Sequence, residues 1–329
     1  MEMIRNIEIK HFKSLEDVRI EGCRRYNLFV GRPNVGKSNL LEALTLFALP
    51  YMGVNKSRLG DWMRCGEVPS LFWNGDVSKP VEVKTFNGDG TVMSSLSMEY
   101  RAADALSLTL REDGKETLYE VADSRMARIP STLPAFKSYR YDRLRMSRGV
   151  SAPFLFPLSG ENLMNMVQRT DRLREELLET LSHYGLGLTF DTGTQEVKFI
   201  KDLGHGMSFI IPFVSIADTL KRLIYYKAAV YGNTGSVLML EEPEAHAYPP
   251  YVVNMIYSII DSPQNQYFIT THSPYVVNEF LENNTDTALF VVDYRDGHTV
   301  VRPLSDEEIQ MVYSDGIDMF FNTELFLED

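Results

Sequence analysis

Three short stretches near the start of the chain carry apolar residues at the spacing of β-strands: MIRNIEIKHF, LEDVRIEG and RYNLFVG. Short polar joints separate them, so the pattern predicts three strands. After the third stretch, Leu40, Leu41, Leu44 and Phe47 recur at helical spacing. The pattern therefore predicts a strand, a loop and an amphipathic helix in direct succession.

Farther along, residues 71–121 alternate between apolar and polar positions, with turn sequences at NGDG and REDGK. This pattern is typical of an antiparallel β lobe. Helical spacing follows from about residue 162 to 183 and again in PFVSIADTLKRLIYYKAAVYG. Two short buried strands are predicted in SVLML and at 267–269, and LFVVDYRDGHTVVRPLSDEEI resembles a closing hairpin.

The amino-acid composition indicates the general class of protein. The chain has 329 residues, of which 44% are hydrophobic and 24% charged, as in ordinary globular proteins. No apolar run reaches the roughly 20 residues that span a bilayer, and the first residues lack the apolar core of a signal peptide. We therefore expect a cytoplasmic protein without membrane contact. The two cysteines, Cys23 and Cys65, predict neither a disulfide framework nor a metal site.

The loop after the third strand, GRPNVGKSN, fits the pattern G-x-x-x-x-G-K-[ST] in full. This is a P-loop, in the expected context of a strand before it and a helix after it. Its glycines let successive backbone N–H groups point at phosphate oxygens, Lys37 supplies a cation, and the Ser38 hydroxyl is a ligand for Mg²⁺. The predicted nucleotide-binding residues are Gly31, Arg32, Pro33, Asn34, Val35, Gly36, Lys37, Ser38 and Asn39.

Acidic residues crowd the end of a later apolar strand, in LMLEEPEAHAYP. Acids that merely face water would explain the crowding, but a P-loop site also needs carboxylates. Glu241 stands where a P-loop enzyme holds Mg²⁺, and Glu242 stands where an acid orients the attacking water. The next strand ends in TTHSP, so His272 is predicted to contact the γ-phosphate.

These three motifs, GRPNVGKSN, LMLEEPEAHAYP and FITTHSPYVV, resemble Walker A, Walker B and the switch histidine of ABC-type ATPase heads. The chain resembles the stand-alone AAA/ATP-binding proteins akin to the OLD family, and more distantly SMC and RecF-like repair ATPases. The resemblance implies an α/β fold, a P-loop NTPase of the ABC-type ATPase head with an antiparallel β lobe and a helical insertion. These heads usually carry Asp at the first Walker B acid, where this chain has Glu241.

The implied organisation is a single head over residues 1–329. Residues 1–50 would supply the N-terminal strands and P-loop, 51–204 the inserted β lobe and helical region, and 205–329 the signature helix, Walker B, switch histidine and closing strands. OLD proteins also carry a TOPRIM nuclease, which we do not expect here because only 57 residues follow His272. No long heptad run predicts the coiled coil of SMC proteins.

ABC-type heads need a signature segment that completes the nucleotide site of a partner subunit. PLSGEN resembles the family's L-S-G-G, but the signature should begin the helix before Walker B, so we expect PLSGEN to be a turn into the helix from about 162. Ser215 and Asp218 form an S-x-x-D capping pattern at the expected place. Ser215 could therefore bind the partner's γ-phosphate, and an ordinary N-cap would explain the same pattern equally well.

The net charge of −12 disfavours general binding to nucleic acid. One basic segment, between Arg125 and Arg148, could still contact DNA or RNA. Its members are Arg125, Arg128, Lys137, Arg140, Arg143, Arg145 and Arg148, with Tyr139 and Tyr141 between them and Asp142 as the one acid. A solvated face neutralised by acidic residues is the simpler interpretation.

The sequence thus predicts an ATPase that binds ATP and Mg²⁺ and forms a head-to-tail homodimer, or a higher homo-oligomer, through the nucleotide site. The resemblance implies a nucleotide-gated switch for a separately encoded effector, a nuclease or toxin, in defence against phage or foreign DNA. Two alternatives stay open. One is a DNA-repair ATPase that uses the basic segment, and the other is a nucleotide-binding scaffold with little hydrolysis.

Overall fold

Two compact units make up the computed structural model of the chain. The structure describes residues 2–112, 114–126, 130, 132–142, 152–191, 193, 196–283, 286–314 and 317–327. The first unit contains residues 1–138, 235–242 and 264–329, and the second contains 139–234 and 243–263. No helix in the described part of the chain is long and apolar enough to cross a membrane.

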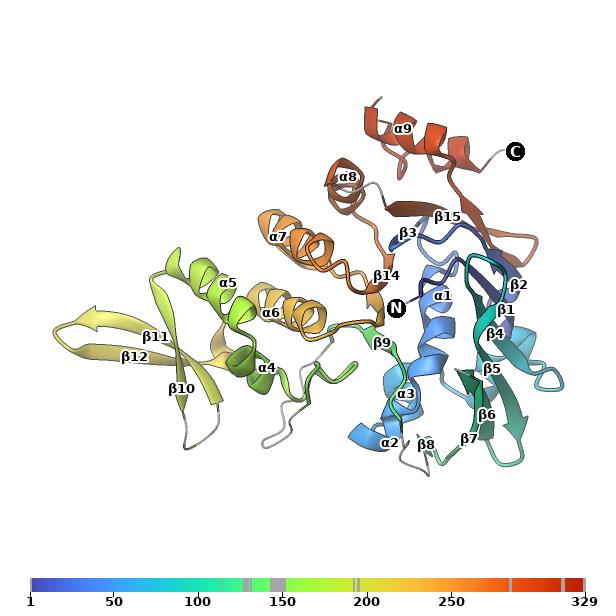
Figure 1. Ribbon diagram of the computed structural model, residues 1–329, viewed down its shortest axis with the longest axis horizontal. Coiled ribbons are helices and arrows are strands. Elements are labelled where there is room, and N and C mark those ends of the chain that lie inside the picture. Colours follow the sequence, from blue (N-terminus) through green and yellow to red (C-terminus); the bar gives the residue numbers. More distant parts are fainter. Residues whose placement is uncertain are drawn as a thin grey trace. The chain divides into compact units, whose positions relative to one another are not determined.

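The first unit contains a seven-stranded antiparallel sheet of order β2-β1-β4-β5-β6-β7-β8 (Figure 1). Its strands are β1 (Asn6–Phe12), β2 (Leu15–Ile20), β4 (Val81–Phe86), β5 (Val92–Arg101), β6 (Ala105–Glu112), β7 (Lys115–Ala122) and β8 (Arg125–Met126). The predicted antiparallel lobe is therefore confirmed. The first two predicted strands also belong to this sheet, since β1 pairs with β4.

The same unit contains a six-stranded sheet of order β16-β15-β3-β14-β13-β9, except that Tyr139, the last residue of β9, is assigned to the second unit. Its strands are β3 (Tyr26–Val30), β9 (Phe136–Tyr139), β13 (Val237–Glu241), β14 (Gln266–Thr270), β15 (Thr287–Arg295) and β16 (His298–Pro303). Every residue of β3 and β14 is buried, as expected for strands covered on both faces. The predicted hairpin is confirmed, because β15 and β16 pair antiparallel.

Strands β15, β3, β14 and β13 run parallel to one another. The register pairs Glu241 with Thr270 and Thr270 with Phe29, so the carboxyl ends of three neighbouring strands are level. Ligands of parallel α/β sheets bind beyond such ends. This edge of the sheet therefore carries the P-loop, the acidic cluster and His272.

Helix α1 (Lys37–Thr45) follows the P-loop and contacts β13 and β14 of one sheet and β1 of the other. Its buried residues include Leu40, Leu41 and Leu44, which confirms the predicted apolar face. Other α-helices in the described part of this unit are α2 (Tyr51–Asn55), α3 (Leu59–Trp62), α8 (Pro274–Asn283) and α9 (Asp306–Ser314).

The second unit combines helices with a three-stranded sheet. Its elements are α4 (Leu163–Arg169), α5 (Asp171–Ser182), β10 (Leu186–Asp191), β11 (Glu196–Gly204), β12 (Met207–Pro212), α6 (Asp218–Tyr231) and α7 (Pro249–Ile260). PLSGEN forms a turn before α4, as predicted. The helix predicted over about 162–183 is broken, because Thr170 is extended (φ −100°, ψ 100°) and stands at the N-cap of α5.

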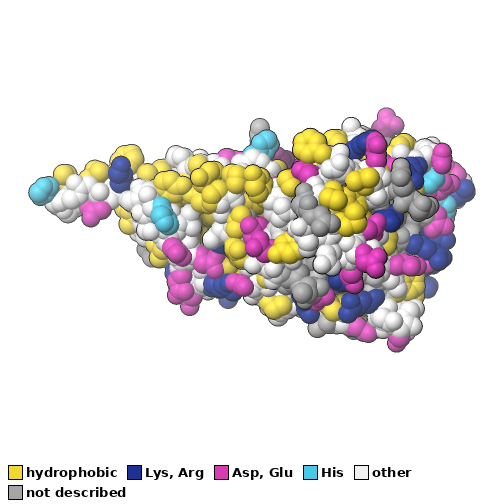
Figure 2. Space-filling view, turned by 90° about the horizontal axis from the view of Figure 1, so that it is seen from above, with side chains coloured by type: hydrophobic (Ala, Val, Ile, Leu, Met, Phe, Trp, Pro, Cys, Tyr) yellow, Lys and Arg dark blue, Asp and Glu magenta, His cyan; other side chains and the backbone are white. Residues whose placement is uncertain are grey.

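Strand β12 is an edge strand with exposed apolar side chains. Met207, Phe209 and Ile210 are each more than half exposed. Hydrophobic side chains are visible on this part of the surface at the left of Figure 2. Apolar surface of this kind is typical of protein interaction sites.

Candidate functional site

A polar pocket of about 400 Å³ lies at the carboxyl edge of the parallel strands, entirely within the first unit. P-loop residues supply most of its wall, and the remaining residues come from the segments after α3, β13 and β14. Its lining residues are Pro33, Asn34, Gly36, Lys37, Ser38, Asn39, Arg64, Glu242 and His272. The structure thus brings the three sequence motifs together around one cavity.

Both P-loop glycines have backbone conformations that other residues rarely adopt, with φ of +148° at Gly31 and +104° at Gly36. Neither position has space for a side chain. A Cβ on Gly31 would lie 2.2 Å from the carbonyl oxygen of Val292, and one on Gly36 would lie 2.1 Å from Oγ1 of Thr299. The loop therefore packs closely against the hairpin of β15 and β16.

Hydroxyl groups brace the P-loop from two distant parts of the chain. Oγ1 of Thr299 donates to the carbonyl oxygen of Val35 at 2.9 Å and lies 2.7 Å from Oγ of Ser14. Ser14 in turn accepts a hydrogen bond from Nδ2 of Asn39 at 2.7 Å. Because the Thr299 proton is directed at Val35, Ser14 donates to Thr299, and the three bonds form one chain. No sequence motif indicated Ser14 or Thr299.

Lys37 is buried at the bottom of the loop, with 5% of its surface exposed. Its Nζ donates to the carbonyl oxygens of Gly31 at 2.9 Å and Arg32 at 2.7 Å. Burial lowers the pKa of Lys37 to about 8, and the charge of Glu242 partly opposes this shift. A buried cation that donates to carbonyl oxygens is suited to bind an anion of higher charge.

Glu242 and His272 lie side by side in the wall of the pocket, with Oε1 of Glu242 3.5 Å from Nε2 of His272. Glu242 has a left-handed backbone (φ +40°), and its N–H donates to the carbonyl oxygen of Thr270 at 3.1 Å. Strain of this type is concentrated at functional sites. Burial, together with the charge of Lys37, lowers the pKa of His272, so the imidazole is neutral at pH 7.

Glu241 lies at the end of β13, and its side chain is 10% exposed. Its Oε1 is 2.6 Å from a guanidinium nitrogen of Arg64, a pocket residue that the sequence did not single out. Within the described residues, no group of three or more His, Cys, Asp or Glu side chains could hold a metal ion. The Ser38 hydroxyl and the Glu241 carboxylate are oxygen donors, which suits Mg²⁺ bound jointly by protein and phosphates.

Five of the predicted site residues do not line the pocket. One is Glu241, which pairs with the pocket residue Arg64. Gly31 and Val35 are buried, and Arg32 pairs with Glu324 at 2.6 Å. Ser215 belongs to the second unit and is exposed. Their predicted ligand contacts stay predictions.

The predicted capping by Ser215 is wrong. Helix α6 begins at Asp218 with Ala217 at its N-cap, and Ser215 ends a short 3₁₀ turn instead. Asp218 is engaged elsewhere, because its carboxylate accepts a hydrogen bond from the Tyr141 hydroxyl at 2.9 Å and pairs with Arg222 at 3.2 Å.

The basic segment is not a continuous exposed stripe where it is described. Lys137 is 6% exposed and donates to Oγ of Ser236 at 2.8 Å, while Tyr139 and Tyr141 are buried. Hydrophobic burial of the strand explains this placement, since Phe136 to Tyr139 form β9. Arg125 is exposed and Arg140 half-buried. Arg128, Arg143, Arg145 and Arg148 lie outside the described residues.

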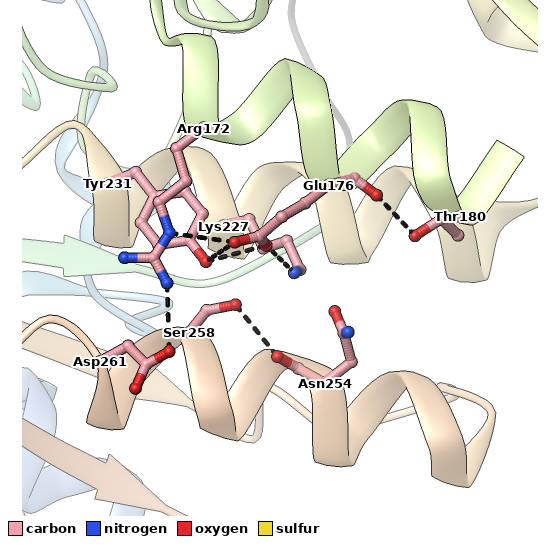
Figure 3. Close-up of polar contacts among 8 residues, drawn as sticks. All are labelled: Arg172, Glu176, Thr180, Lys227, Tyr231, Asn254, Ser258 and Asp261. Carbon is pink, nitrogen blue, oxygen red and sulfur yellow. Dashed lines mark hydrogen bonds and ion pairs between the residues drawn. The ribbon is translucent and has the colours of Figure 1, made fainter.

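Helix α6 is fixed within the second unit by a polar network with α5 and α7 (Figure 3). Lys227, which is 3% exposed, pairs with Glu176 of α5. The hydroxyl of Tyr231 donates to the same carboxylate at 2.7 Å. Arg172 lies 4.5 Å from the ring of Tyr231 and pairs with Asp261, the C-cap residue of α7, at 3.1 Å.

We expect Glu176→Ala to lower the free energy of unfolding by about 3 kcal/mol, because it leaves the Lys227 ammonium buried without its carboxylate. Urea unfolding followed by circular dichroism measures the change. Glu175→Ala is the matched control, since Glu175 is exposed on the same helix. Equal stability of the two variants would contradict a structural role for the network.

Comparison with known proteins identifies a matching protein family. A family model described as an AAA ATPase domain matches residues 3–116 and 159–277, more than half of the chain. An ATP/GTP phosphatase of Helicobacter pylori is 21% identical over an alignment of 380 positions, gaps included, which covers 97% of this chain and 100% of that protein. The DNA replication and repair protein RecF of Streptococcus agalactiae is 39% identical over 46 residues, 14% of this chain and 12% of RecF.

Among solved structures, the chain is similar to an Smc head domain with an extended coiled coil, derived from Pyrococcus furiosus and bound to the C-terminal domain of ScpA. The TM-score is 0.52 at 13% identity, over 96% of this chain and 99% of that one. This likeness shows a shared fold.

Proposed function

The chain belongs to the family of AAA ATPase domains, and from this we propose that it is a nucleotide-gated switch. It is an ATPase with the fold of a P-loop, ABC-type head. In our proposal it binds ATP with Mg²⁺, two copies associate head to tail around the nucleotide, and hydrolysis separates them.

One observation carries the proposal. The P-loop, Glu242 and His272 follow three neighbouring strands and line one polar pocket. A polyphosphate fits this arrangement, because backbone N–H groups and Lys37 supply positive charge while Glu242 is placed for a water molecule.

Each residue then has a distinct task. Lys37 binds the outer phosphates, and Ser38 and Glu241 would hold Mg²⁺, which neutralises phosphate charge when bound. Glu242 accepts a proton from the attacking water as it approaches the γ-phosphate. Neutral His272, 3.5 Å from Glu242, is able to donate a hydrogen bond to a γ-phosphate oxygen.

The second subunit would contribute the start of α6. Ser215 is exposed there, and among the described residues no side chain caps the first turn of this helix. Helix starts of this type suit anions. Association of two subunits would pass the nucleotide state to a separately encoded effector, a nuclease or toxin, in defence against phage or foreign DNA.

The test is the molar mass in solution of wild type and Glu242→Gln, with and without MgATP, together with phosphate release. We expect wild type to release phosphate, and the variant to form a dimer or larger assembly only with MgATP. A nucleotide-bound monomer in both proteins would contradict the shared site. Stable assembly with MgATP but no phosphate release would favour a scaffold with little hydrolysis.

A further inference from the structure

Arg64 connects the nucleotide pocket to the carboxylate proposed to hold Mg²⁺. It lines the pocket, its side chain is 52% exposed, and its guanidinium lies 2.6 Å from Oε1 of Glu241. Glu241 is only 10% exposed, so its charge needs compensation inside the protein. A guanidinium that is half exposed can leave this position more easily than a buried one.

The backbone of Arg64 is held in place, while its side chain is half exposed. Its N–H donates to Oε1 of Glu42 at 3.2 Å, and its carbonyl oxygen accepts a hydrogen bond from Nζ of Lys13 at 2.9 Å. Glu42 itself is buried in α1, directly after the P-loop, and pairs with Lys13. Helix α1 therefore fixes the position of the Arg64 backbone through Glu42.

We propose that Arg64 is a nucleotide-binding residue that exchanges partners, pairing with Glu241 in the free protein and with a phosphate of the nucleotide once Glu241 binds Mg²⁺. The inference rests on the proposed function. When Glu241 binds Mg²⁺ instead of Arg64, the guanidinium of Arg64 stays beside the P-loop without that carboxylate. The planar N–H donors of a guanidinium match phosphate oxygens. Affinity for the nucleotide and affinity for the metal would then be coupled through one side chain.

The test is the affinity of a non-hydrolysable ATP analogue for wild type and Arg64→Gln, measured by calorimetry in Mg²⁺ and in EDTA. We expect Arg64→Gln to weaken binding about tenfold in Mg²⁺ and less than twofold in EDTA, where Glu241 retains the arginine. Arg111→Gln is the matched control, because Arg111 is exposed and pairs with Glu116 in the antiparallel sheet. We expect no change in this control.

A second arm removes the carboxylate. In a Glu241→Gln background, Arg64 has no Glu241 charge to hold it, so Arg64→Gln should weaken binding severalfold in EDTA as well. A simple effect of positive charge predicts the opposite pattern in the wild-type background, with the larger loss in EDTA, where the analogue is more negative.

If Arg64→Gln loses as much affinity for the analogue in EDTA as in Mg²⁺, or more, the proposed exchange of partners is wrong. If it loses no affinity in either condition, Arg64 is not a nucleotide-binding residue. Lys37→Ala separates these results from failure of the nucleotide site itself. If Lys37→Ala binds the analogue as tightly as wild type, the proposed nucleotide site is wrong. If Lys37→Ala loses binding, the nucleotide site is supported, and the Arg64 variants then test the exchange of partners separately.

Discussion

Replacing Lys37 by alanine should abolish nucleotide binding, with a loss in affinity of at least about a hundredfold. Hydrogen bonds to charged groups contribute about 1.5–3 kcal/mol each, and Lys37 would make two or more to the phosphates. In the free protein its ammonium donates to two carbonyl oxygens, and burial lowers the pKa of Lys37. Calorimetric titration with MgADP measures the loss.

The variant should remain folded. Burial already disfavours the charged form of Lys37, so its removal should not lower the melting temperature. Lys79→Ala is the control, because Lys79 is exposed and outside the pocket. Binding by Lys37→Ala within threefold of wild type would contradict the nucleotide site.

Replacing Glu242 by glutamine should leave nucleotide affinity near the wild-type value and slow hydrolysis about a hundredfold or more. A positioned general base contributes 10²–10⁴-fold in rate, and the amide of glutamine cannot accept the proton. The left-handed backbone at Glu242 directs this one side chain into the pocket beside His272. Single-turnover phosphate release in MgATP measures the rate separately from product release.

Glu67→Gln provides the comparison, since Glu67 is exposed and does not line the pocket. It should hydrolyse ATP at the wild-type rate. If Glu242→Gln matches it, another group activates the water, and the assignment of Glu242 is wrong.

Much of the fold and the pocket followed from local patterns. The P-loop, the acidic strand end and His272 were predictable because each motif is short, and because ends of parallel strands meet at one edge of a sheet. The antiparallel lobe and the final hairpin were likewise evident from alternation and turn residues.

The remaining features depend on contacts that no local pattern encodes. Arg64 stands alone in a segment without periodicity, and Thr299 reaches the P-loop across 264 residues of sequence. Ser215 had the sequence of a cap, yet α6 starts at Asp218, whose carboxylate accepts a hydrogen bond from the distant Tyr141 and pairs with Arg222 within the helix. Lys137 was misassigned because its charge concealed a buried strand position.

The central position of β3 has a consequence for folding during synthesis on the ribosome. Both neighbours of this strand, β14 and β15, come from the last quarter of the chain, and 240 residues separate Asn27 from the Tyr267 carbonyl to which its side chain donates. Contacts so distant in sequence form late, because a long loop must close first. During synthesis the P-loop sequence leaves the ribosome early, but the strands that flank it follow more than 200 residues later. The nascent chain therefore cannot use nucleotide binding to stabilise its first half.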